Sequence, residues 1–251
     1  MSAEATEDGL SEDRFLGGRV RLLQPLAGYR AATDPVLLAA AVPAKPGETV
    51  LDLGCGVGAA GLCLAARVPV VLSGLEIQPD YLALARRNGA LNQTPITLYQ
   101  GDVAAPPRDL RQIVFDHVIT NPPFHDTHDL PSPVPGRDRA HRAGIALDDW
   151  VAAALARVRP KGWLTIIHRA DKLARILAAL GGAGDIAIKP LAARDGRDAK
   201  RVLIRARKGV KSPLRLCAPL VLHKGAAHLA DEDDFTDETR AILRGTAAIA
   251  F

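Results

Sequence analysis

The sequence is poor in cysteine: of its 251 residues only Cys55, Cys63 and Cys217 are cysteines, and no two of them form a Cys-x-x-Cys pair. That spacing argues against a disulfide framework or a zinc site and favours reduced, buried thiols in a cytosol. Apolar runs long enough to span a bilayer are also lacking. Residues 1–15 have neither the basic start nor the apolar core of a signal peptide. These absences predict a cytoplasmic protein without a membrane partner.

Aromatic residues are scarce as well, at 4% of the chain, whereas apolar residues make up 48% and charged residues 24%. This composition is typical of a globular protein of enzyme size, and the length suits one large α/β domain or two small ones. The net charge of +4 is compatible with a nucleic-acid partner, but many proteins of that charge bind none.

Strands and helices alternate along most of the chain. The acidic, polar residues 1–13 predict a disordered tail. A short helix over 34–42 follows, with Asp34 as its N-cap and Pro35 at its first position. Apolar runs then predict strands at 48–54, 70–76, 96–102, 114–120, 162–168, 184–191 and 200–208. Helical patterns lie between them, at 59–68, 79–92, 147–158 and 171–180.

This alternation predicts an α/β fold. We expect a seven-stranded, mostly parallel sheet with helices on both faces and an antiparallel last strand. A β-hairpin over 214–224 and a terminal helix near 236–243 should follow. Residues 14–251 are expected to form a single domain. The long irregular segment 125–145 is typical of a lid, a binding loop or local disorder.

A glycine-rich loop follows the first strand of this sheet. It contains Gly54, Gly56, Gly58 and Gly61. Glycines permit a tight turn and a close approach of the backbone to a ligand. Glu76 ends the second strand, where an acid can accept hydrogen bonds from both hydroxyls of a ribose. The loop therefore favours either a nicotinamide dehydrogenase or an S-adenosylmethionine-dependent methyltransferase over a plain strand-to-helix turn.

Two further acids favour the methyltransferase. Asp52 precedes the first glycine, where a carboxylate would repel a pyrophosphate but attract the sulfonium and ammonium of S-adenosylmethionine. Asp102 follows the third strand, where it could accept from the exocyclic amine of the cofactor's adenine. Alone, Asp102 would be interpreted as a cap or turn residue; its position within the set indicates a cofactor contact.

The fourth strand ends in the corner Asn121-Pro122-Pro123-Phe124. Prolines terminate strands, so a simple turn is one interpretation. With the glycine loop, however, the corner resembles the class I methyltransferases, a Rossmann-like family, and among them the enzymes that methylate an exocyclic or amide nitrogen. The resemblance implies that these four residues are catalytic and that Asn121 also contacts the cofactor.

The residue types of the corner suit that reaction. A planar NH2 group is a poor nucleophile, and the Asn121 side-chain oxygen and the Pro122 carbonyl can accept its two hydrogens and aim its lone pair. Phe124 offers a stacking face for a base brought out of its stack. Acceleration would then come from positioning and electrostatics, and we expect neither a metal nor a catalytic nucleophile.

From about Arg14 onward the chain resembles the bacterial tRNA adenine-N6 methyltransferases that modify the adenosine beside the anticodon of valine tRNA. The resemblance rests on ATDPVLLAA, IIHRADKL and KRVLIRARKG. It implies S-adenosylmethionine as cofactor and RNA, specifically tRNA, as partner. It also implies that segment 14–46 closes over the cofactor, which would make Asp34 a cofactor-binding residue.

The sequence NPPFHD departs from the tyrosine corner of many adenine-N6 enzymes, because a histidine, His125, follows the aromatic residue. It is also similar to the corner of ribosomal-RNA guanine-N2 methyltransferases, which are typically longer, with a duplicated domain. Protein-glutamine N5 methyltransferases share NPPY but carry a helical N-terminal domain. Both acceptors stay open as alternatives, as do a NAD-dependent dehydrogenase and a non-enzymatic RNA-binding module.

Basic residues gather in the irregular segment and around the last predicted strand. They could form a track for RNA phosphates, although such residues usually only solvate a surface. His125 and His128 fit a solvated loop better than a phosphate or base contact, and Trp150 and Trp163 fit core or rim packing. The candidate track comprises Arg137, Arg139, His141, Arg142, Arg194, Arg197, Lys200, Arg201, Arg205, Arg207, Lys208 and Lys211.

Overall fold

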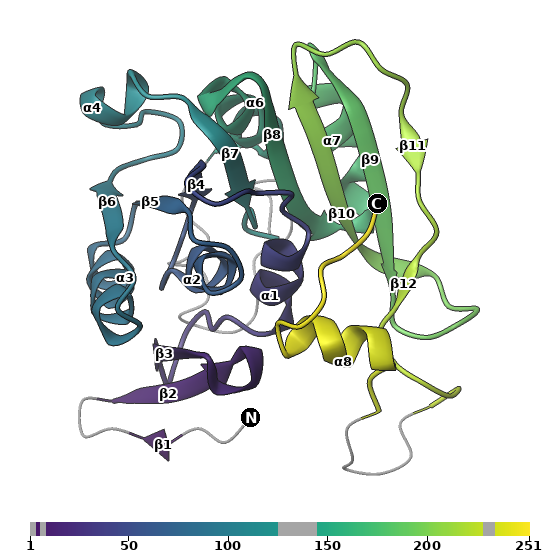
Figure 1. Cartoon of the computed structure of the whole chain (residues 1–251). Coiled ribbons are helices and arrows are strands. Elements are labelled where there is room, and N and C mark those ends of the chain that lie inside the picture. The colour runs from purple at the N-terminus through teal and green to yellow at the C-terminus, as the bar shows by residue number, and fades with distance from the viewer. Residues whose placement is uncertain (1–3, 6–8, 125–144, 228–233) are drawn as a thin grey trace.

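The computed structural model describes residues 4–5, 9–124, 145–227 and 234–251. Its largest element is a single sheet (Figure 1). Seven of its strands form its main part: β4 (Thr49–Leu53), β5 (Val71–Glu76), β6 (Ile96–Gln100), β7 (Phe115–Thr120), β8 (Val158–Arg169), β9 (Ala183–Ala192) and β10 (Ala199–Lys208). They lie in the order β9-β10-β8-β7-β4-β5-β6.

Strands β4 to β8 pair in parallel. Strand β10 is antiparallel to both of its neighbours, β8 and β9. The predicted seven-stranded, mostly parallel sheet with an antiparallel last strand is therefore confirmed. Because parallel strands end at the same edge of a sheet, the glycine loop after β4 and the proline corner after β7 are brought together there.

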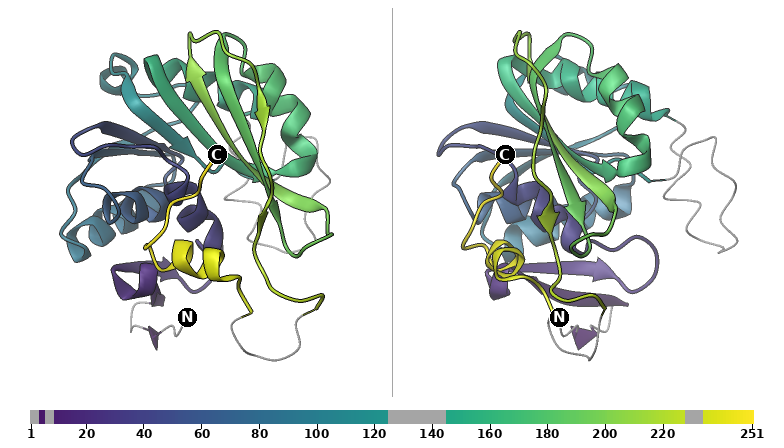
Figure 2. Two further views of the ribbon diagram at one scale, coloured as in Figure 1. Left: turned by 45° about the vertical axis from the view of Figure 1, so that its right-hand side comes forward. Right: turned by 90° about the vertical axis from the view of Figure 1, so that its right-hand side faces the viewer.

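Helices cover both faces of the sheet (Figure 2). One face packs against α1 (Thr33–Ala40), α2 (Ala59–Ala65), α3 (Pro79–Leu91) and α8 (Asp237–Leu243). The other packs against α4 (Arg108–Arg111), α6 (Leu147–Arg157) and α7 (Leu173–Ala179). Each layer has its own hydrophobic core, as the α/β prediction requires. Within the described residues, no helix is long and apolar enough to cross a membrane.

The N-terminal segment is folded where a disordered tail was predicted. Strands β1 (Glu4–Ala5), β2 (Leu10–Phe15) and β3 (Val20–Pro25) form a separate antiparallel sheet. Two polar residues of β2, Ser11 and Asp13, are buried in it, and hydrogen bonds rather than apolar contacts stabilise their burial. The tail prediction for 1–13 is wrong at Glu4–Ala5 and from Leu10 onward. Strand β2 buries polar side chains and therefore carries no hydrophobic alternation that the sequence could reveal.

The predicted hairpin over 214–224 is also wrong. Strands β11 (Arg215–Leu216) and β12 (Leu220–Val221) both pair in parallel with β9, so the chain runs along the edge of the sheet without reversing. They extend the main sheet to nine strands. The terminal helix is confirmed as α8, and the side chain of its N-cap, Thr236, accepts from the Thr239 N–H.

Helix α1 differs from the prediction at its start. It begins at Thr33, its N-cap is Ala32, and no side chain caps it. The predicted cap, Asp34, lies inside the first turn and forms an ion pair with Arg201 of β10. The Asp34 carboxylate therefore pairs with Arg201, which is distant in sequence, and does not cap the helix as local sequence rules predict.

Candidate functional site

A cavity of about 460 Å³ opens at the carboxyl ends of the parallel strands. This size suits a small-molecule ligand. Its walls come from the loop before α1, the glycine loop, the ends of β5, β6 and β7, and helix α6. The lining residues that the chemistry below concerns are Tyr29, Asp52, Glu76, Asp102, Asn121 and Trp150.

The glycine loop joins β4 to α2 and follows a backbone path that favours glycine. Gly54, Gly56 and Gly58 all have positive φ angles, of 72°, 54° and 85°. At Gly54 a side chain would in addition meet the Trp150 ring, since a Cβ there would lie 2.7 Å from the nearest ring carbon. The loop can therefore pass close to a ligand and to α6 at once.

Asp52 is a buried carboxyl group at the end of β4. Its Oδ2 accepts from the Gly61 N–H at 2.9 Å. Burial, together with the negative charge of Glu76, raises the pKa of Asp52 to about 7. Among the described residues Asp52 has no ion-pair partner. A buried acid of this kind gains a favourable partner when a cation binds beside it.

Glu76 ties the glycine loop to the end of β5. Its Oε2 accepts from the Gly56 N–H and its Oε1 from the Gln78 N–H, each at 2.9 Å. Each carboxylate oxygen can accept more than one hydrogen bond, so the group can still bind a hydroxyl. Asp102, after β6, lines the cavity as well, and its Oδ1 accepts from the Ala104 N–H at 2.9 Å, which is the local turn contact that the simpler interpretation expected.

The corner after β7 lines the same cavity with all four of its residues, Asn121, Pro122, Pro123 and Phe124. Asn121 Nδ2 donates to the Tyr29 hydroxyl at 3.5 Å. Asn121 Oδ1 is buried and has no hydrogen-bond partner in the described part of the chain. Buried polar atoms almost always have a partner, so this oxygen lacks a donor that a ligand could supply.

His168, at the end of β8, supports the Phe124 ring from the side. The ring centroids are 5.3 Å apart and the ring planes meet at 82°. This edge-to-face arrangement is a favourable one for aromatic rings. Burial lowers the pKa of His168, so the imidazole is neutral at pH 7. Phe124 therefore packs against a buried, uncharged aromatic neighbour.

Sequence reasoning missed three aromatic residues of the cavity, Tyr29, Tyr81 and Trp150. Trp150 was expected to be packing alone; it does pack, but it also lines the cavity, and its Nε1–H donates to Thr120 Oγ1 at 2.9 Å. Tyr29 was not singled out, and its carbonyl accepts from the Tyr81 hydroxyl at 3.2 Å. The only sequence signal was an aromatic residue in segment 14–46, beside a helix expected near the cofactor.

Two residues of the predicted cofactor set do not line the cavity. Gly58 lies behind it, where its positive φ shapes the loop. Asp34 is held away from it by Arg201. The remaining predicted residues are brought together around one space: Asp52, Gly54, Gly56, Glu76, Asp102, Asn121, Pro122, Pro123 and Phe124.

The basic residues divide into three groups. Those of the irregular segment lie outside the described residues: His125, His128, Arg137, Arg139, His141 and Arg142. Arg201 pairs in register with Arg169 at the site edge of the sheet, and the β9–β10 loop with Arg194 and Arg197 adjoins it. Arg207 instead lies opposite Trp163, toward the other edge.

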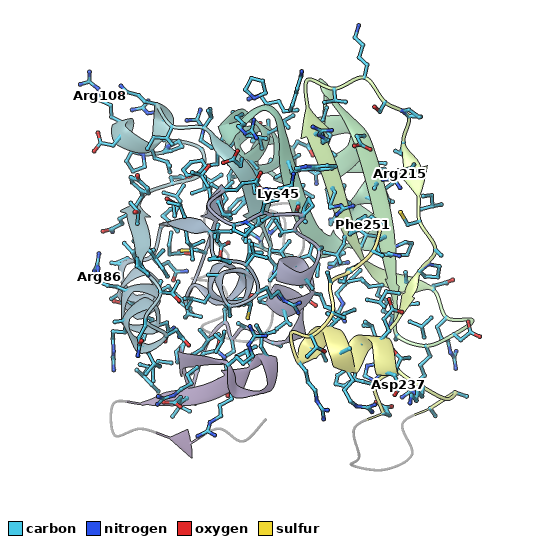
Figure 3. All side chains as sticks on the ribbon, in the orientation of Figure 1. Lys45, Arg86, Arg108, Arg215, Asp237 and Phe251 are labelled. Carbon is cyan, nitrogen blue, oxygen red and sulfur yellow. The ribbon has the colours of Figure 1, made fainter. Side chains whose placement is uncertain are left out.

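The part of the predicted RNA track that lies toward the other edge, from Arg205 to Lys208, makes contacts within the protein. The Arg205 guanidinium lies 3.9 Å from the ring centroid of Phe251. Figure 3 labels Phe251, the last residue of the sequence. Lys208 Nζ donates to the carbonyls of Ala156 and Val158. Nearer the site edge, Arg194 and Arg201 are also paired within the protein, with Asp234 and Asp34.

Comparisons with known proteins agree with this geometry. A curated relative from Shewanella loihica named tRNA1(Val) (adenine(37)-N6)-methyltransferase is 31% identical over 160 residues, 61% of this chain and 65% of that protein. A release factor glutamine methyltransferase from Geobacter sulfurreducens is 33% identical over 147 residues, 55% of this chain and 51% of that protein. The matches thus span between about half and two thirds of these curated relatives.

A solved structure from Agrobacterium tumefaciens, described as a predicted O-methyltransferase, covers 87% of this chain and 99% of its own, with 30% identity and a TM-score of 0.69. The family model described as methyltransferase small domain matches residues 32–177, which include the glycine loop, the acids at the strand ends and the proline corner. Since that match spans more than half of the sequence, the chain belongs to the methyltransferase small domain family.

Proposed function

We propose that this protein is a cytoplasmic S-adenosylmethionine-dependent methyltransferase that acts on N6 of an adenosine in RNA, specifically tRNA. One observation carries the proposal: the buried Oδ1 of Asn121, which has no partner among the described residues, belongs to the same cavity as the acids Asp52 and Glu76. A site for a cationic ligand thus adjoins an oxygen that lacks a donor. The names of the curated relatives from Shewanella species support the choice of adenine.

The residues fit the cofactor. Asp52 is a buried acid without a cationic partner among the described residues, which suits the ammonium and sulfonium charges. Glu76 and Asp102 suit hydroxyl and amine donors at neighbouring strand ends, and Gly54 and Gly56 let the backbone approach. When bound, S-adenosylmethionine supplies an electrophilic methyl group. A nicotinamide cofactor fits less well, because its pyrophosphate would approach the Asp52 carboxylate.

The corner fits an amine acceptor. An NH2 group has two hydrogens, and Asn121 Oδ1 and the Pro122 carbonyl offer two acceptors for them. The oxygen acceptor of an O-methyltransferase has a single hydrogen and would leave one of these acceptors without a donor. Phe124, which packs against His168, supplies a face on which a base can stack. These groups position the amine and polarise it without exchanging a proton with it.

The acceptor is identified by a direct experiment. The protein is incubated with labelled S-adenosylmethionine and, in parallel, with total tRNA, ribosomal RNA and a protein fraction, and the product is hydrolysed and analysed by mass spectrometry. We expect N6-methyladenosine from tRNA. N2-methylguanosine or N5-methylglutamine would assign the site to the other acceptors, and RNA binding without any methyl transfer would indicate a binding module.

A further inference from the structure

The amide group of Asn121 has a defined orientation. Its Nδ2 donates to the Tyr29 hydroxyl at 3.5 Å, whereas its Oδ1 has no partner among the described residues. A half-turn of the amide would exchange the two atoms and present N–H donors where an NH2 group needs acceptors. In the orientation that the structure shows, the Tyr29 hydroxyl accepts from Nδ2, and Oδ1 is left to accept from the substrate.

Tyr29 is itself held on both sides. The Tyr81 hydroxyl of α3 donates to the Tyr29 carbonyl at 3.2 Å. Two residues later, the Ala31 N–H donates to Gln24 Oε1 of β3 at 2.7 Å. The tyrosine thus sits in a short loop whose backbone is fixed to the third helix and to the N-terminal sheet.

The N-terminal sheet anchors this loop through a buried polar network. Asp13 Oδ2 accepts from Gln24 Nε2 at 2.7 Å and from Arg30 Nη2 at 2.6 Å. Asp13 and Gln24 are only 6% and 1% exposed. Burying a charge and an amide is costly unless they are fully paired, and apolar residues would stabilise such a sheet at least as well. The network is better explained by the loop position that it fixes.

We propose that Tyr29 is a positioning residue of the acceptor site. Its hydroxyl accepts from Asn121 Nδ2 and keeps Oδ1 in the orientation that accepts a hydrogen from the substrate amine. The Asp13–Gln24–Arg30 network acts through it by holding the loop in place. The inference rests on the proposed function in one respect, that the acceptor is an amine.

The kinetic test is Tyr29→Phe, which keeps the ring and removes the hydroxyl. We expect kcat for methyl transfer to fall about three- to tenfold, the range for one net hydrogen bond, with the Kd for S-adenosylmethionine unchanged. In an Asn121→Ala background the same change should have no further effect. Tyr99→Phe is the matched control, because Tyr99 lies on β6 outside the cavity, and it should keep the full rate.

A second readout does not depend on turnover. In nitrogen-15 NMR spectra, the Asn121 side-chain amide signal, assigned by its loss in Asn121→Ala, should become more mobile in Tyr29→Phe and stay unchanged in Tyr99→Phe. An active wild-type protein whose Tyr29→Phe variant keeps full kcat and an equally rigid amide would overturn the inference. A wild-type protein that methylates no RNA would refute the proposed function instead, and the amide signal alone would then decide the role of Tyr29.

Discussion

Asp52 should couple cofactor binding to the release of a proton. Burial raises the pKa of this carboxyl group from 3.8 to about 7. Near neutral pH the free protein therefore holds both the acid and the carboxylate. A cofactor with two positive charges should bind the carboxylate form and drive the proton off.

The size of this effect follows from the pKa. With a value of about 7, roughly nine-tenths of Asp52 is ionised at pH 8 and about one-tenth at pH 6. The apparent Kd for S-adenosylmethionine should thus rise about tenfold from pH 8 to pH 6, or by about 1.4 kcal/mol. Calorimetry in buffers of different ionisation enthalpy should also find about half a proton released per bound cofactor at pH 7.

The matched control is Asp52→Asn. Its amide oxygen can still accept from the Gly61 N–H, but the side chain cannot ionise. The variant should bind more weakly at every pH and should change only with the titration of the ligand's own amino group, which affects both proteins equally. If the wild-type protein showed no greater dependence on pH than Asp52→Asn, the reasoning about this buried acid would be refuted.

Two further predictions concern the acceptor side. Phe124→Ala should weaken binding of a tRNA fragment by about 1–3 kcal/mol in a fluorescence titration, because a stacking face is lost. Cofactor affinity should stay unchanged. Weaker cofactor binding would show that the ring contacts the cofactor. Burial lowers the pKa of His168 below 6.5. Below pH 6.5 the unfolded chain therefore takes up a proton that the folded protein does not, so the contribution of this group to the free energy of unfolding falls as the pH drops. His168→Leu should make the loss of stability between pH 7 and pH 5 smaller in urea denaturation, and an identical loss in both proteins would contradict this.

The main sheet and the core of the site could be predicted because their signals are local. Each strand of the parallel sheet is an apolar run bounded by turn residues, and the chemistry lies at strand ends. Asp52 and Glu76 lie at or next to the last residue of their strands, and Asn121 directly follows its strand. The carboxyl ends of parallel strands meet at one edge of the sheet whatever the details of packing. Sequence order was therefore sufficient to bring these residues together.

The missed features depend on tertiary partners that local sequence rules do not identify. Asp34 pairs with Arg201, which lies 167 residues later in the sequence, and does not cap its helix. Tyr29 accepts a hydrogen bond from Asn121, which lies 92 residues later. Strand β2 looked like a tail because Asp13 is buried through hydrogen bonds, which leave no hydrophobic period in the sequence. Likewise, β11 and β12 are positioned by the exposed edge of β9, which local turn rules cannot reveal.

The rate of methyl transfer in Asn121→Ala tests the central claim most directly. A single turnover on tRNA, with the methylated nucleoside identified by mass spectrometry and cofactor affinity measured in parallel, separates the acceptor role of the residue from any cofactor role. We predict N6-methyladenosine, a rate lower than that of the wild-type protein by about two to three orders of magnitude, and an almost unchanged cofactor Kd. A variant that methylates adenosine at the wild-type rate would show that the corner is only a turn and would contradict the account.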